Sequence, residues 1–453
     1  MFHLRFSKKA LVNATKRVAP FTVSSQSAEQ RHRVVLLRPD TTADVVHLVA
    51  ENQGSAAHVS TQTGAVEILG SEPIVVAANS LLVAFDAMPD EGMLECVKAD
   101  GSTQVVIRSC DSQPEIVLPA QSAGPDADPD TPIPSVRESI GEGICMRTAD
   151  LVHAHHAAAR VASMAFNGTL QEVLAETFDG KEHRLLRLGA MSETGATVWR
   201  TVPVTGDTDI LTLLPMASTS GSMNFSAILS RLSETAVLRI QYDDVDGREN
   251  TKVLHLRGYV GEVADDIDAV DVDSLTEDIH IRMAVSASDP AMHRLTNEKI
   301  MDTLKGFVTS LTDGDSFVVD RHQFFESMDH AAAVAGLNAI SHEKANVLLD
   351  EGEHGLLIET EGDSSFTDDI PFLIEPEAMD HMAVAWSVMR PLMDTCPDEQ
   401  GRIRLNIVRK PARDPKAPAV ARAILLFSEE DWQQRMEHPL PDDYIAIIPL
   451  TVM

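Results

Sequence analysis

Apolar and polar positions follow the same order three times along this chain. Each repeat opens with a helix that has one apolar face, continues through short strands of alternating character, contains a second helix and returns to strands. The repeats run from Ser7 to about Ala120, from Ala149 to about Gly258, and from Phe317 to the C-terminus. Self-similarity on this scale predicts an array of like modules.

The first repeat shows the pattern most clearly. Ser7 is the expected N-cap of a helix over Lys8–Val18, whose apolar face is Leu11, Ala14 and Val18. The other expected helices are Asn79–Met88, Ala149–Ser163, Met223–Leu232, Arg321–Ala335 and Pro376–Met393. The expected strands are Val34–Leu37, Val45–Ala50, Ala57–Thr61, Val105–Ser109, Glu115–Leu118, Leu170–Ala175, Leu185–Leu188, Thr197–Val204, Ala236–Tyr242, Lys252–Leu256, Asn346–Leu349, Gly355–Glu359, Ile403–Arg409, Ala419–Phe427 and Tyr444–Leu450.

Two acidic stretches separate the repeats. Pro119–Gly143 is rich in Pro, Asp, Ser and Gly, and Val263–Asp278 is acidic with few aromatics, so both are expected to be solvated linkers. A helical insert is expected at Asp289–Leu311. The predicted organisation is module 1 at 1–120, an acidic Pro-rich linker at 121–145, module 2 at 146–260, an acidic linker and helical insert at 261–315, and module 3 at 316–453.

Composition supports several ordinary cores without metals or disulfides. The length of 453 residues fits about three domains. Apolar residues make up 44% of the chain and aromatic residues only 4%, so the cores must consist mainly of aliphatic side chains. Four cysteines show no C-x-x-C spacing, so neither a disulfide framework nor a zinc site is indicated, and no cofactor is expected. The longest apolar run, Leu81–Met88, is far shorter than the ~20 residues of a membrane span. A soluble, cytoplasmic protein is expected.

The formal charge of −32 opposes nucleic-acid binding over the molecule as a whole. Beyond about 8 Å such a charge is screened at physiological salt, so a local basic strip can still dominate a contact. The helix Lys8–Val18 is such a strip, because its polar side carries Lys9, Asn13, Lys16 and Arg17 with no acidic residue.

Four stretches carry a resemblance to a known family. They are Phe6–Leu11 leading to Val18, Val106–Ser109 followed by Ile116–Ala120, Val319–Arg321 leading to Phe324 and Phe325, and Tyr444–Leu450. Their order and spacing resemble the bacterial DNA polymerase III sliding clamp, the β subunit. The resemblance spans nearly the whole chain.

The resemblance implies an α+β fold with three similar DNA-clamp modules per chain, helices lining a central hole and antiparallel sheets on the outside. Two chains would form a head-to-tail homodimer ring around double-stranded DNA, held by sequence-independent phosphate contacts. Such a protein is no enzyme. It is a replication processivity factor at the nucleoid that tethers DNA polymerase, clamp loader and repair factors through short linear motifs.

The resemblance also implies two sets of site residues. The expected DNA-binding residues are Lys8, Lys9, Lys16, Arg17, Arg31, Arg160, Arg231, Arg321 and Arg390. The expected partner-peptide pocket is formed by Val198, or its neighbour Trp199, with Ala446, Ile448, Pro449 and Leu450. Each cation could instead belong to a solvated helix face, and the C-terminal strand could instead be an ordinary buried strand.

The chain also departs from the family pattern. Ser192–Arg200 lacks the basic pair that the family carries in its second domain, and Gln113, Pro114 and Glu115 stand where edge-strand apolar residues are usual. A proline on a sheet edge normally blocks pairing. These departures and the extra length indicate a divergent member of phage or mobile-element type.

Other functions have weaker support. His153 and His156 share a helix face near His155 and His183, but no carboxylate follows at ligand spacing. The acidic runs at Asp265 and Asp271 lack the Gly and Glu of a calcium loop. Because cations are few in modules 2 and 3, the alternative function is a clamp-fold decoy or regulatory protein that binds clamp-interacting peptides without encircling DNA.

Overall fold

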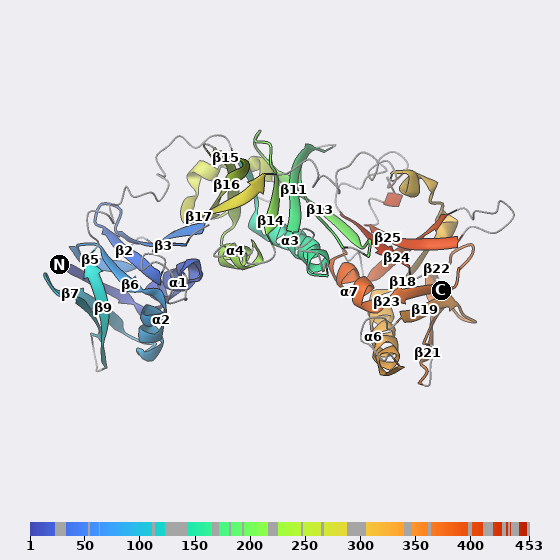
Figure 1. Ribbon diagram of the computed structural model, residues 1–453, viewed down its shortest axis with the longest axis horizontal. Helices are drawn as coiled ribbons and strands as arrows, with labels where there is room; N and C mark the ends of the chain where they lie inside the picture. The colour runs from blue at the N-terminus through green and yellow to red at the C-terminus, as the bar shows by residue number, and fades with distance from the viewer. Residues whose placement is uncertain are drawn as a thin grey trace. The chain divides into compact units, whose positions relative to one another are not determined.

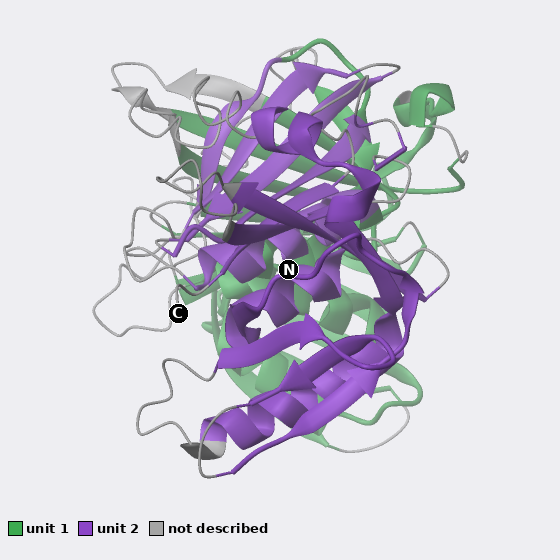
Figure 2. Ribbon diagram, turned by 90° about the vertical axis from the view of Figure 1, so that its right-hand side faces the viewer, with its two compact units in different colours: residues 1–149, 204–208, 217–287 green, residues 150–203, 209–216, 288–453 purple. Residues whose placement is uncertain are grey.

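The computed structural model of the chain divides into two compact units, which are coloured separately in Figure 2. Unit 1 comprises Met1–Ala149, Val204–Thr208 and Ala217–Ala287, and unit 2 comprises Asp150–Pro203, Asp209–Met216 and Ser288–Met453. The structure describes residues 1–22, 33–52, 55–62, 64–110, 114–122, 143–164, 172–180, 183–192, 194–215, 225–245, 248–263, 267–287, 305–338, 346–360, 364–396, 401–410, 420–427, 432–433, 435 and 444–450.

Unit 1 is built on antiparallel strands, several of which are labelled in Figure 1. Their bounds are β1 Phe2–Ser7, β2 Val34–Asp40, β3 Val45–Glu51, β4 Ser55–Ser60, β5 Val66–Ser71, β6 Ile74–Ala77, β7 Met93–Lys98, β8 Gln104–Ser109, β9 Glu115–Ser122, β10 Ile144–Arg147, β15 Val237–Val245, β16 Arg248–Val260 and β17 Thr276–Ala287. Pairing runs β5-β1-β7-β8-β9-β6-β2-β3-β4-β17-β16-β15-β10. Strands far apart in sequence are therefore joined where β4 meets β17.

The helices of unit 1 pack on this sheet through apolar faces. They are α1 Lys8–Val18, α2 Ala78–Ala87 and α4 Phe225–Leu232, and α3 Thr148–Ala162 begins in unit 1 and continues in unit 2. In α1 the buried residues include Leu11, Ala14 and Val18, the face that the sequence predicts. Ser7 is the N-cap of α1, although its side chain makes no capping hydrogen bond.

Unit 2 contains three groups of antiparallel strands. One is β12 Arg184–Met191, β11 Glu172–Asp179 and β14 Leu211–Pro215. A second is β22 Phe372–Ile374, β18 Ser316–Asp320, β24 Arg402–Lys410, β25 Val420–Phe427, β26 Tyr444–Pro449 and β13 Thr197–Val204. The third is β21 Thr367–Ile370, β20 Leu356–Glu359, β19 Asn346–Glu351 and β23 Met382–Ala385. Helix α6 Arg321–Asn338 packs on the third group and against α7 Trp386–Thr395.

One predicted helix is wrong in its first half. The sequence predicts a helix over Pro376–Met393, but α7 begins at Trp386 and Met382–Ala385 is β23. Strand β23 pairs with β19, and three of its four residues are buried. Tertiary pairing therefore outweighs the local helix preference of Met and Ala.

The second acidic stretch is more structured than expected. Val263, Val270 and Leu275 pack against a cluster of Cys145, Val237, Tyr259 and Val272. The following strand β17 has no counterpart among the predicted elements. Of the expected insert, residues 305–310 are helical and 289–304 lie outside the described residues. Within the described residues, no helix is both long and apolar enough to span a membrane.

Candidate nucleic-acid and partner sites

The polar face of α1 presents two available cations. Lys9 and Lys16 are exposed, as is Asn13 between them, and neither lysine forms an ion pair with another described residue. Lys9 and Asn13 border a hollow of about 350 Å³ whose other wall includes Val59 and Asp278. These two lysines can meet a polyanion without giving up an internal partner.

Lys8 is used inside the molecule. Its Nζ donates to the carbonyl of Met88 at 2.8 Å, contacts the carbonyl of Asp86 at 3.5 Å and pairs with Asp90 at 2.7 Å. Met88 is the C-cap residue of α2, so the lysine meets the negative end of that helix. Only 13% of the Lys8 side chain is exposed. Its placement is that of a helix cap.

Arg321 holds the corresponding position in unit 2. It is the first residue of α6, as Lys8 is the first residue of α1. Its Nη1 donates to the carbonyl of Cys396, the C-cap residue of α7, at 3.0 Å, and its Nη2 donates to the carbonyl of Met393 at 2.8 Å. In both places, the cation that opens the first helix satisfies carbonyls that end the second helix.

A neutral version of this contact joins α3 and α4. Thr148, the first residue of α3, donates a 3.0 Å hydrogen bond to the hydroxyl oxygen of Thr235, whose own proton is donated to the carbonyl of Leu232 at 2.6 Å. Leu232 is the last residue of α4. The same structural role thus recurs at the three helix pairs with Lys, Thr and Arg in the first position.

Arg17 and Arg231 are also committed to unit 1. Arg17 pairs with Asp278 at 2.6 Å, and its Nε donates to the carbonyl of Arg231 at 3.3 Å. Only 11% of the Arg17 side chain is exposed, and Arg231 is half-buried in the last turn of α4. Arg17 therefore ties α1 to β17 and α4.

The helices of unit 2 present more carboxylates than cations. Arg390 pairs with Asp329 and donates to Asp394 at 3.1 Å, and its guanidinium lies 4.4 Å from the centre of the Phe325 ring. The exposed residues of α6 include Glu326 and Asp329. Arg160 on α3 is exposed, with His156 at 3.3 Å as its neighbour. Arg31 lies outside the described residues.

The expected pocket residues divide between core and surface. Val198, Ala446 and Ile448 are fully buried, and Val198 faces Ala446 in the β13–β26 register. Pro449 and Leu450 are half-buried. The three buried residues are not accessible to a peptide in this structure, because they lie on the core face of their strands.

The opposite face of β26 belongs to a larger apolar cluster in unit 2. Its buried members are Leu174, Trp199, Leu213, Val308, Leu311, Val408, Leu425, Phe427, Trp432 and Ile445. Partly exposed side chains pack around them, namely Met191, Leu211, Phe307, Ala423 and Ile447. We call this set the unit 2 apolar cluster. Trp199, which the sequence offers as the alternative to Val198, belongs to this cluster. The other members could not be predicted from the sequence, because their proximity depends on which strands pair.

Trp432 is held in this cluster from both sides. Its ring lies 5.7 Å from the ring of Phe427, and the guanidinium of Arg435 lies 3.6 Å from its centre. Arg404 approaches the same ring at 5.0 Å. Aromatic and Arg side chains of this kind supply much of the binding energy of many protein interfaces.

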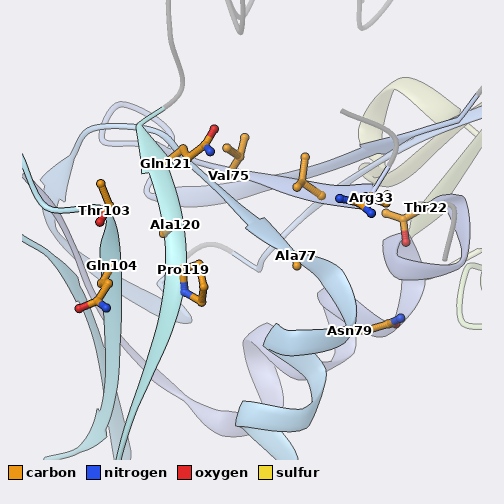
Figure 3. Close-up of a pocket in the computed structure, with 11 residues that line it drawn as sticks. Thr22, Arg33, Val75, Ala77, Asn79, Thr103, Gln104, Pro119, Ala120 and Gln121 are labelled. Atoms are coloured by element: carbon orange, nitrogen blue, oxygen red, sulfur yellow. The ribbon is translucent and has the colours of Figure 1, made fainter. Parts of the chain in front are cut away.

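A second hollow in unit 1 was not expected from the sequence. It measures about 550 Å³ and is lined by Arg33, by Asn79 at the start of α2 and by Pro119 of β9 (Figure 3). Its lining has no cluster of catalytic groups.

The histidines of α3 do not converge. His155 is buried, and desolvation lowers its pKa to about 4, whereas His153 and His156 are exposed. The described part of the chain contains no group of three or more His, Cys, Asp or Glu placed to hold a metal ion.

Comparison with known proteins gives a clear result for the fold. No protein-family model and no curated protein sequence matches the chain. The β subunit of DNA polymerase from Streptococcus pyogenes matches with a TM-score of 0.68 at 11% identity, covering 100% of each chain. The DNA polymerase III β subunit of Thermotoga maritima matches with a TM-score of 0.64 at 15% identity, again over 100% of each chain. The DNA polymerase sliding clamp of Bacillus subtilis matches with a TM-score of 0.65 at 14% identity, covering 100% of this chain and 99% of that one.

Proposed function

From the α+β fold of the bacterial DNA polymerase III β sliding clamps, which this chain has over its whole length, we propose that it is itself a DNA sliding clamp. The observation that carries the proposal is the agreement of the full chain, end to end, with complete clamp chains despite 11–15% identity. The sequence resemblance predicts the same fold, and that prediction is confirmed.

The proposed mechanism is enclosure. Two chains close head to tail around duplex DNA, and the ring slides because it contacts phosphates without reading bases. Lys9, Lys16 and Arg160 are the cations that we assign to the DNA, since they are exposed on helices. Lys8, Arg321, Arg17 and Arg390 act mainly by holding the helices in place.

Head-to-tail closure needs two different, complementary sheet edges on each chain. Among the described residues, Glu115–Pro119 of β9 pair only with β8, whereas Ala120–Ser122 pair with β6, and β21 pairs only with β20. Asp368 and Asp369 lie on β21, and Arg5 and Arg108 lie on the sheet that contains β9. We assign these two edges to the dimer contact, with Pro114 limiting the pairing of β9 at its start.

A second function has one specific observation in its favour. The cations expected on α6 and α7 are engaged internally, and the exposed face of α6 carries Glu326 and Asp329. Carboxylates repel phosphates. The second candidate is therefore a clamp-fold protein that binds clamp-interacting peptides and never encloses DNA.

Retention on circular DNA distinguishes a sliding clamp from a clamp-fold protein that only binds peptides. The wild-type protein is incubated with a nicked circular duplex, passed through a gel-filtration column and assayed before and after the circle is linearised. A sliding clamp stays with the circle and leaves after linearisation, whereas the second candidate is never retained.

Paired variants test the assignment of the cations. Lys9→Glu with Lys16→Glu should abolish retention and lower the salt slope of DNA binding by about 4, because each of the two chains in the ring loses two phosphate contacts. The matched control, Lys305→Glu with Arg422→Glu, changes the charge equally at exposed positions of unit 2 that are on neither α1 nor α3 and should behave as wild type. An equal loss of DNA retention in both double variants would contradict the assignment of Lys9 and Lys16 to the DNA.

The unit 2 apolar cluster is our proposed docking site for the short motifs of polymerase, loader and repair factors. Ile447→Asp places a charge at the partly exposed rim of the cluster and should weaken binding of a clamp-binding peptide at least tenfold. Leu373→Asp, at a 48% exposed position of β22, is the control and should leave the affinity unchanged. Peptide binding is measured by fluorescence anisotropy. Unchanged binding by the Ile447 variant would remove this site.

A further inference from the structure

Four histidines cross the sheet of unit 1 on adjacent strands. His47 lies on β3, His58 on β4, His280 on β17 and His255 on β16. Their neighbours along each strand, such as Leu48, Val59 and Ile281, are buried in the core, so the histidines occupy the opposite face. His58 and His280 are direct partners in the register of β4 and β17. The row therefore spans the joint between strands near the N-terminus and strands more than 200 residues later.

Hydrogen bonds connect the row on each side of the joint. His47 Nδ1 and His58 Nε2 are 3.0 Å apart, and His255 Nδ1 and His280 Nε2 are 3.1 Å apart. Ser60 also meets His47 Nδ1 at 2.9 Å. In such a pair one ring nitrogen donates its proton and the other must be unprotonated to accept it. Two charged rings would turn two donors toward each other.

The surroundings disfavour charge on His47, His58 and His280. Burial, together with His47 and Arg38, lowers the pKa of His58 to about 4. Burial, with Arg257, His255, His58 and Arg282, lowers the pKa of His280 to about 2. For His47, burial also lowers the pKa, and Asp40 at 3.6 Å from its Nε2 opposes this effect. The remaining charges around the row are Glu51, which acts on Arg282, Glu277, which pairs with Arg257 at 3.1 Å, and Arg239, which acts on Glu277.

We propose that this histidine row makes the β4–β17 joint acid-sensitive: His58 and His280 oppose each other across the joint, which is closed while both rings are neutral and opens when protons bind to them. The joint has an apolar side, with Ala57, Val59 and Ile279 buried, and the histidine side opposite. Opening exposes the rings to water, where they bind protons readily. Acid therefore favours the open joint through His58 and His280, which face each other across it, while the rest of the sheet keeps its pairing.

The direction follows from proton linkage. A histidine whose pKa is lowered in the closed joint binds a proton first in the open form, so closure is fully favoured above pH 6.5 and weakens as the pH falls below it. At pH 5.0 the change from a pKa of 6.5 to about 4 at His58 raises the open population about 30-fold relative to pH 7.5. His280 acts in the same direction.

Hydrogen exchange with mass spectrometry tests the proposal on the full chain. Protection factors, with the intrinsic pH dependence of exchange removed, are compared at pH 7.5 and pH 5.0. Peptides from β4 and β17 should lose protection at least tenfold, while β24 and β25, which contain no histidine, should change less than threefold. A loss under tenfold in β4 and β17, or an equal loss in β24 and β25, overturns the proposal.

Two variants sharpen the result. His58→Gln with His280→Gln removes the titrating rings. The loss of hydrogen-exchange protection in β4 and β17 between pH 7.5 and pH 5.0 should then be at least tenfold smaller than in the wild-type protein. His354 is an exposed histidine between β19 and β20, and His354→Gln is the matched control. This variant should lose as much hydrogen-exchange protection in β4 and β17 between pH 7.5 and pH 5.0 as the wild-type protein does. A double variant that folds and retains the wild-type loss overturns the proposal. If it does not fold, the wild-type comparison of β4 and β17 with β24 and β25 decides alone.

Discussion

Replacing Arg321 with Met separates a structural cation from a DNA contact. The side chain donates to the carbonyls of Met393 at 2.8 Å and Cys396 at 3.0 Å, and its charge faces the C-terminal end of α7. Each of the two charge-assisted hydrogen bonds contributes about 1 kcal/mol net, and the helix terminus contributes about 0.5 kcal/mol. After allowance for partial exposure, the substitution should therefore lower the free energy of unfolding by about 2 kcal/mol. Met keeps the apolar part of the side chain, so packing is largely retained.

Tryptophan fluorescence during urea unfolding measures this loss. All three tryptophans, Trp199, Trp386 and Trp432, belong to unit 2, and Trp386 is the first residue of α7. With an m-value of about 2 kcal/mol/M, Arg321→Met should lower the midpoint by about 1 M. His322→Gln, at the exposed next position, should change it by less than about 0.2 M. An unchanged midpoint in Arg321→Met, accompanied by weaker DNA binding, would refute the capping role.

Three further predictions concern charge. Glu326→Lys with His322→Lys adds two cations to the exposed face of α6 in each of the two chains, and DNA binding should tighten with a salt slope steeper by about 4 in titrations of a fluorescent duplex; unchanged affinity would place α6 away from DNA. Hydrogen bonds from His3 and Arg108 lower the pKa of Glu95 from 4.5 to about 2, so its stabilisation is present above pH 4.5 and is lost as the pH falls toward 2. Glu95→Gln should therefore reduce the acid dependence of unfolding in that window, measured by circular dichroism; the same dependence in both proteins would contradict the assignment. Lys8→Met should lower the hydrogen-exchange protection of the last turn of α2 about tenfold while Lys9→Met leaves it unchanged, and equal protection in the two variants would show that Lys8 is no cap.

The sequence predicts helices and strands well where one face of an element is apolar. The helix Lys8–Val18 agrees with α1 at both ends, because Leu11, Ala14 and Val18 recur at helical spacing and are buried. Strand β17 was missed because its outward positions are occupied by His280, Arg282 and Asp278, which look like a polar segment. Only the pairing of β17 with β4 and β16 makes those residues part of a sheet.

The site residues were harder to predict for a geometric reason. A cation at the first position of a helix has the same sequence pattern whether it points to a ligand or to the end of a second helix. Lys8 and Arg321 do the latter, and the partner carbonyls are 72 to 80 residues away in sequence. On β26, Ala446 and Ile448 share a face as predicted, but which face is buried depends on pairing with β13 and β25.

Imaging of the purified protein by electron microscopy at micromolar concentration tests the central claim most directly. The account predicts closed rings made of two copies of the 49.2 kDa chain around an open centre, with duplex DNA passing through that centre when a short duplex is added. Single chains that never close, or DNA bound only along the outer edge of the particles, would contradict it.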